Sequence, residues 1–483
     1  MEALDQARDA AAPNARGAES GEGHGFWATV REAIRGSRHV YTEGPIGRAI
    51  VLLAIPMVLE MAMESIFAVA DVFYVGRLGA DAVATIGLTE SVLTLLYAVA
   101  MGLSIGGMAL VARRIGEKDA HAAAIVAGQA ILLGVLIALP VGLFGLLFAR
   151  QILEAMGASS WVLENGLGYT RIMFACNGCI LLLFLINAIF RGAGDAAISM
   201  RVLWLANAIN LILAPCLIFG LGPFPALGVK GAAAATSCGR GIGVLYQLYR
   251  LSRGDGRVTL RLHHLKPRWE TMRTMLRLSG SAVIQSLVGM SSWVFLVRII
   301  SSFGSAAVAG WTIAMRIVLF ALLPSWGMSS AAATMVGQSL GAHKPERAER
   351  AAVIAGIYNM LFLGAVGLCF FVLVEPIVGL FSRDPAVLPV AARALRTLAI
   401  GFPFYAWGMV FTQSFNGAGD TNTPTLLNVI VFWLFEIPLA WALARPLGYG
   451  PPGVFFAAAI AFCLLALLSG VLFKRGQWKL RRV

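Results

Sequence analysis

Residues 49–75 read AIVLLAIPMVLEMAMESIFAVADVFYV, an apolar stretch that is long enough to cross a lipid bilayer as a helix. Three carboxylates interrupt it: Glu60, Glu64 and Asp71. At about 100° per residue, their spacing places Glu64 and Asp71 within roughly 40° of Glu60 on one helix face. Each carboxylate at the centre of a bilayer costs about 2.5–3.5 kcal/mol on insertion scales. Three on one face therefore predict a pathway for protons or cations.

The rest of the 483-residue chain is also apolar. Hydrophobic residues make up 58% of it and charged residues 13%, and its mean hydropathy is +0.78, far from the values of soluble proteins. Apolar runs predict twelve transmembrane helices, at about residues 48–75, 82–111, 121–149, 162–190, 197–221, 229–250, 277–302, 307–336, 350–380, 388–415, 423–446 and 453–473. The expected fold class is an all-α polytopic membrane protein.

The net charge of +13 is concentrated in the loops after the second, sixth and eighth predicted helices and in the C-terminal tail. An excess of Lys and Arg marks cytoplasmic loops. We therefore expect a multi-pass protein of the bacterial inner membrane with both termini in the cytoplasm. Its basic residues are expected to contact anionic lipid and no nucleic acid. Residues 1–44 should form a cytoplasmic tail, with a short amphipathic helix at Phe26–Arg35 on the membrane surface.

An internal repeat has an offset of about 225 residues. Its matching segments are FRGAGD at 190–195 with FNGAGD at 415–420, LGADAVA at 78–84 with FGSAAVA at 303–309, Gly102 with Gly327, and Gly116 with Gly341. The repeat predicts two six-helix lobes, residues 45–250 and 276–483, joined by a basic cytoplasmic linker at 251–275. Six helices per lobe give both lobes the same orientation, so a pseudo-twofold axis along the membrane normal should relate them, as in transporters. We interpret Asp195 and Asp420 as caps of the helices that follow the repeated turns.

Four motifs in this order resemble the multidrug and toxic compound extrusion (MATE) family, over about residues 45–475. They are AIPM at 54–57, ADVFYVGRLG at 70–79, VGQSLGA at 336–342 and the paired GAGD turns. The resemblance implies an antiporter for multidrug efflux. Such a protein exports small amphipathic, often cationic, compounds while protons or sodium ions move inward, and its lobes alternate between outward and inward openings.

The resemblance also implies a coupling site in the N-terminal lobe, where Asp71, Asn210 and Thr236 match the positions used in one branch of the family. A second acidic position of that branch is occupied by Ala214. Another branch places acidic residues on the seventh and tenth helices, and this chain has none there. We therefore expect Glu60, Glu64 and Glu90 to supply what Ala214 lacks. Carboxylates with an asparagine serve protons or sodium equally, so both ions remain open.

Adaptable Met and aromatic side chains suit amphipathic cations and mark candidates for the cargo path. They are Met57, Met61, Trp293, Phe404 and Tyr405, although ordinary packing explains each one alone. Two further intramembrane charges are cargo-path candidates as well. Arg316 and Glu436 are expected to pair with each other or with the N-terminal carboxylates.

Several functions lack a matching pattern in the sequence. It contains no nucleotide-binding loop, no set of metal ligands and no nucleophile with a general base. We therefore expect no enzyme activity, no cofactor and no obligate protein partner. The alternatives to an exporter are a lipid-linked oligosaccharide flippase of the same superfamily, which usually has fourteen spans or a strongly cationic cleft, and a membrane-embedded enzyme.

Overall fold

The computed structural model describes residues 26–481 except 38, 255 and 383. The predicted tail before residue 26 lies outside these residues. Helix α2 (Phe26–Arg35) forms where the amphipathic helix was predicted. Its buried Ala33 packs near the start of α3, while Trp27 is exposed. Every regular element of the described residues is helical.

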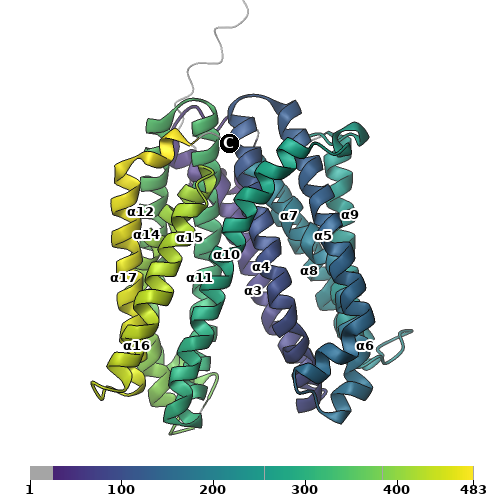
Figure 1. The fold of residues 1–483 in the computed structure, drawn as a ribbon, viewed down its shortest axis with the longest axis vertical. Coiled ribbons are helices and arrows are strands. Elements are labelled where there is room, and N and C mark those ends of the chain that lie inside the picture. Colours follow the sequence, from purple (N-terminus) through teal and green to yellow (C-terminus); the bar gives the residue numbers. More distant parts are fainter. Residues whose placement is uncertain (1–25, 38, 255, 383, 482–483) are drawn as a thin grey trace, which may run out of the picture.

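The first bundle contains α3 (Ile46–Gly76), α4 (Ala80–Gly116), α5 (Ala120–Ala155), η1 (Val162–Gly166), α6 (Leu167–Ala175), α7 (Asn177–Ala193), α8 (Ala196–Phe219) and α9 (Val229–Arg253). After η2 (Leu262–Leu265), the second bundle contains α10 (Trp269–Ile300), η3 (Ser301–Phe303), α11 (Ser305–Gly341), α12 (Pro345–Val372), α13 (Val374–Gly379), α14 (Leu388–Gly417), α15 (Asn422–Asn428), η4 (Val429–Glu436), α16 (Ile437–Ala444), α17 (Pro451–Arg475) and η5 (Gln477–Leu480). Figure 1 shows the two bundles side by side, close together at the end that carries the C-terminus and diverging toward the other end.

The predicted all-α polytopic fold with twelve helices in two related bundles is confirmed. In the described residues, ten helices are long and apolar enough to cross a membrane, and η1–α6 with α7, which meet at 41°, form an eleventh. The twelfth predicted span is α9. Its sequence is rich in Gly and Ala and carries Lys230 and Arg240, so it is less apolar than the others.

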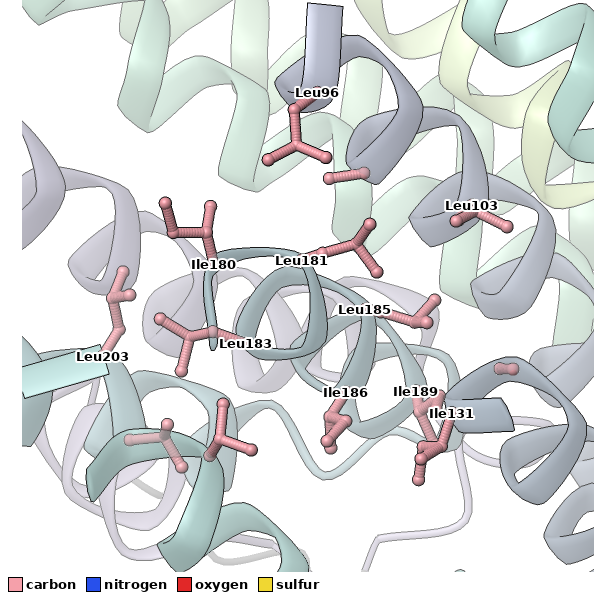
Figure 2. Packing of buried hydrophobic residues seen from close by; sticks show 14 of the residues in the cluster. Leu96, Leu103, Ile131, Ile180, Leu181, Leu183, Leu185, Ile186, Ile189 and Leu203 are labelled. Carbon is pink, nitrogen blue, oxygen red and sulfur yellow. The ribbon is translucent and has the colours of Figure 1, made fainter. Parts of the chain in front are cut away.

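Helix α7 lies at the centre of the first bundle. Figure 2 shows its Ile and Leu side chains surrounded by Leu96 and Leu103 of α4, Ile131 of α5 and Leu203 of α8. A helix that is apolar on nearly every side suits this central position, because it has no face to turn toward water. The second bundle has its own buried core, which extends from Leu296 to Trp478.

Helix α10 joins the two bundles. Its first turns, including Met275 and Leu278, pack in the core of the first bundle, whereas Leu296 and Ile300 belong to the second core. Gly106 makes the close contact with α4 possible, because a Cβ there would lie 2.6 Å from Ser279 Oγ. The physical border between the bundles therefore lies within α10, beyond the linker predicted from the sequence.

The two repeated turns have the same backbone shape. Gly194 and Gly419 both adopt the left-handed conformation, with φ of 88° and 83°, which favours glycine. The capping prediction for Asp195 and Asp420 is wrong, since neither side chain caps the following helix. The Asp195 carboxylate accepts a hydrogen bond from the backbone N–H of Arg257, at 2.8 Å. Asp420 lies 3.4 Å from an Arg481 nitrogen. Each aspartate thus holds the segment that follows its own bundle.

The bundles contact each other tightly at the end that carries α2 and the C-terminus, hereafter the closed end. Thr334 Oγ1 donates to the Arg191 carbonyl at 3.1 Å, and Gln338 Nε2 donates to the Gly192 carbonyl at 2.9 Å. Gly116 and Gly341, the repeat-related pair, face backbone atoms of the opposite bundle. Arg347 donates to three carbonyls of residues 41–44. Helix ends and loops therefore lock this end.

The linker between the bundles is hydrogen-bonded to α5, and we expect these contacts to weaken at acidic pH. Gln129 Nε2 donates to the His264 carbonyl at 2.9 Å, and His264 Nδ1 accepts from the backbone N–H of Arg261 at 3.1 Å. Burial, then the nearby His263 and His121, lower the pKa of His264 below its usual value. A released His264 binds a proton more readily than a docked one, so docking is strongest above about pH 6.5 and weakens below it.

Hydrogen exchange tests this prediction. Backbone amides of residues 257–268 should exchange faster at about pH 5.5 than at about pH 7.5, after correction for intrinsic rates. His264→Asn keeps an acceptor near the position of Nδ1 and does not titrate, so it should lose the pH dependence. An unchanged pH dependence in this variant would count against His264 as the cause.

Candidate functional site

Glu60 is buried at the centre of a polar group in the first bundle. Its side chain is only 1% exposed. Oε1 accepts from Asn187 at 3.2 Å and from Arg191 at 3.1 Å, and Oε2 accepts from Ser199 at 2.8 Å. Three donors, one of them a guanidinium, satisfy the carboxylate and offset its desolvation. Glu60 is therefore held by α7 and α8, and through Arg191 it adjoins the closed end.

Glu64, one turn further along α3, faces a second arginine. Arg240 of α9 is 7% exposed, and its Nη2 lies 3.8 Å from Glu64 Oε1. Asn207 Nδ2 donates to the other carboxylate oxygen at 3.1 Å. Arg240 also reaches the Tyr97 hydroxyl, at 3.5 Å, and the ring of Phe67, whose centroid is 5.8 Å from the guanidinium carbon. This arginine is fixed inside the bundle.

Asp71 and Glu90 complete the cluster, and no basic residue among those described makes a direct ion pair with either of them. Arg240 is close enough for its charge to act on both carboxylates, and the charge of Asp71 acts on Glu90. Asp71 is partly exposed and Glu90 is exposed, whereas Glu60 is buried. The cluster therefore grades from a fully paired carboxylate near the closed end to accessible ones further along α3 and α4.

The two uncharged residues expected at the coupling site lie together. Asn210 Nδ2 donates to Thr236 Oγ1 at 2.8 Å, joining α8 to α9 one turn from Arg240. Ala214, at the second acidic position expected on α8, is buried at 1% exposure and has no carboxyl group to offer. The carboxylates of the polar cluster lie instead on α3 and α4.

The cargo-path candidates are spread over the molecule. Trp293 and Tyr405 line a cavity of about 460 Å³ in the second bundle. Met57 is buried against α11 at the bundle interface, and Met61 is partly buried. Phe404 and Arg316 are exposed. The lining of that cavity includes none of Met57, Met61, Phe404 and Arg316.

The expected ion pair between Arg316 and Glu436 does not form. Glu436 is 3% exposed and accepts a hydrogen bond from Ser292 Oγ at 3.3 Å. Neither Arg316 nor any other described basic residue makes an ion pair with it. The sequence indicated two intramembrane charges but did not indicate that Glu436 takes a serine hydroxyl as its partner.

Sequence reasoning missed the partners of the carboxylates. These are Asn187, Arg191, Ser199, Asn207 and Arg240, which lie on three other helices. One signal was present. An arginine in the middle of a predicted transmembrane helix, such as Arg240, is as costly as a carboxylate and predicts a buried acidic partner.

Comparison with known proteins places these features in a family. The family model MatE matches residues 56–216 and 281–442, once in each bundle. The chain is 24% identical over 450 residues to a probable multidrug resistance protein NorM of Thermotoga maritima, covering 91% of this chain and 94% of that protein. It is 26% identical over 443 residues to a FAD transporter of Shewanella oneidensis, covering 91% of this chain and 96% of that protein.

Solved structures agree with this assignment. An outward-facing multidrug resistance MATE family transporter superposes with a TM-score of 0.86 at 26% identity, covering 91% of this chain and 98% of that one. A MOP superfamily transporter from Pyrococcus furiosus also gives a TM-score of 0.86, at 25% identity, covering 92% and 100%. The likeness extends over both bundles.

Proposed function

Because the chain belongs to the MatE family of membrane transporters, which are not enzymes, we propose that it is a proton-coupled exporter of small organic molecules. The observation that carries the proposal is the cluster of Glu64, Asp71, Glu90 and Arg240 in the first bundle. Carboxylates that share one fixed cation inside a membrane protein mark ion or proton pathways.

The fixed guanidinium favours the proton over sodium as the coupling ion. Arg240 already occupies the place of a cation beside Glu64, and its charge also acts on Asp71. A sodium ion about 5 Å from it would be repelled by about 3 kcal/mol at an effective dielectric constant near 20. A proton removes a carboxylate charge and requires no further ligands, so it avoids much of this repulsion. When Glu60 and Arg191 are counted as well, four carboxylates face two guanidinium groups. Negative charge is therefore in excess, and this favours the uptake of protons.

Glu60 lies on α3, the helix that also carries Glu64 and Asp71, and it contacts the closed end. Glu60 holds Arg191, and the Arg191 carbonyl accepts from Thr334 of the opposite bundle. Protonation along α3 changes the charge balance around Arg191 and Arg240, and this biases the packing of α7 against α11. Pro56, inside α3, removes one helix hydrogen bond and allows the helix to bend. We propose that the closed end faces the cytoplasm of an inner membrane.

The flippase alternative receives less support. A flippase for lipid-linked oligosaccharides would need a strongly cationic cleft for its phosphate groups, and the cavity in the second bundle has no charged lining residue. The names of the relatives cover drugs and FAD, so they do not specify one class of cargo.

Export assays test the proposed site. Asp71→Asn and Glu64→Gln should each abolish drug resistance in a sensitised bacterial host, with the protein still present in the membrane in normal amounts. Glu154→Gln, which removes a carboxylate from an exposed pair with Arg150, should retain full resistance. Full resistance in both Asp71→Asn and Glu64→Gln would reject the site.

A further inference from the structure

The cavity of about 460 Å³ lies between α10, α11, α14, α15, η4 and α17 of the second bundle, and Met101 and Ile105 of α4 complete its wall. Four aromatic side chains line it: Trp293, Trp326, Tyr405 and Phe432. Its volume falls in the range of sites for drug-sized molecules. Flat aromatic walls suit a planar ring system, which can stack against them.

The lining carries no charge. Every charged residue of the proposed proton site lies in the other bundle, on α3, α4 and α9. The carboxylate of Glu436 belongs to η4, but it is buried, receives a hydrogen bond from Ser292 and does not line the cavity. A cation entering the cavity would lose hydration without meeting a counter-charge. Contacts between a cation and aromatic rings compensate only part of that loss.

Three side-chain amides line the cavity, Gln285, Gln413 and Asn428, beside the hydroxyls of Ser286, Thr412 and Tyr405. Gln285 is 7% exposed, and its Oε1 has no hydrogen-bond partner among the described residues. Gln413 Oε1 already accepts from Asn416 at 3.3 Å, so Gln413 offers the cavity its N–H donors. A buried acceptor without a partner and a nearby donor are a site for a ligand edge that both donates and accepts.

We propose that this cavity binds the cargo, and that the preferred cargo is an uncharged planar aromatic molecule with a hydrogen-bond donor and an acceptor on its edges. The inference rests on the proposed export function and specifies its substrate class. It also separates cargo from proton: they bind in different bundles and do not compete for one carboxylate. Coupling then passes through the packed helices, where Gly102 approaches the Ser279 carbonyl and Gly327 approaches that of Met57.

A pair of three-ring probes tests the preference on the purified full-length protein. Acridone is neutral with one N–H and one carbonyl, and 9-aminoacridine has the same skeleton but is a cation at neutral pH. Titration calorimetry should give acridone at least about tenfold tighter binding. Gln285→Leu should weaken acridone about fivefold or more. The control Gln151→Leu, on an exposed stretch of α5, should bind acridone normally.

Three results would overturn the proposal: no binding of acridone, tighter binding of 9-aminoacridine that Glu436→Gln abolishes, or acridone affinity unaffected by Gln285→Leu. Asp71→Asn separates this proposal from the proton site. It should bind acridone with wild-type affinity and fail to transport it. If Asp71→Asn transports normally, the proton site fails while the cargo site stands. If Asp71→Asn loses acridone binding, cargo and proton share a site and the cargo proposal fails.

Discussion

Gly116→Ala and Gly341→Ala are each expected to abolish export while leaving the protein folded and inserted. A Cβ on Gly116 would overlap the backbone carbonyl of Gln338, and a Cβ on Gly341 would overlap that of Arg113. These obstacles are backbone atoms of the opposite bundle and cannot rotate away. Overpacking of this kind typically costs about 1–3 kcal/mol, which shifts the population of the closed end by roughly 5- to 150-fold.

The accessibility of the closed end measures this shift directly. Ser339 is fully buried there, so a Ser339→Cys probe in a cysteine-free background should be labelled slowly. Gly116→Ala should speed the labelling, because the end can no longer close. Gly87→Ala is the matched control, since it lies on the same helix and a Cβ there meets nothing within 4 Å. Normal export by Gly116→Ala would show that this contact is not required for transport.

Arg240→Ala is expected to destabilise the protein by about 3 kcal/mol, because it leaves Glu64 partly buried without its cation. This loss of stability is at the low end of the range for buried ion pairs that lose one partner, because Asn207 still donates a hydrogen bond to Glu64. The double variant Arg240→Gln with Glu64→Gln should recover most of this loss, because no unpaired charge remains. Denaturation of the purified proteins checks both values. A double variant as unstable as Arg240→Ala would mean that Arg240 does not act through Glu64. Export should be lost in Arg240→Ala and in the double variant alike.

Helical periodicity predicted that Glu60, Glu64 and Asp71 share one face of α3, and their side chains do turn toward the same bundle. Periodicity describes one helix at a time. It contains no information on which residue of another helix comes opposite, so Arg191 and Arg240 could not be assigned from it. Those contacts depend on helix positions that are specified only by packing across the whole bundle.

The repeat shows the same limit. Gly116 and Gly341 were paired in the sequence as evidence of duplication, but the sequence did not indicate that they touch across the interface. The twelve helices were predictable because long apolar runs have few alternatives in a membrane protein. The role of Asp195 was not predictable, because an aspartate before a helix usually caps it, and here a distant arginine takes that carboxylate instead.

Transport in proteoliposomes, with a pH gradient and a sodium gradient imposed separately, distinguishes proton coupling from sodium coupling. We expect the pH gradient alone to drive cargo movement, the sodium gradient to drive none, and Asp71→Asn to abolish the response to pH. Transport driven by sodium alone, or an undiminished response to pH in Asp71→Asn, would contradict proton coupling at the acidic cluster of the first bundle.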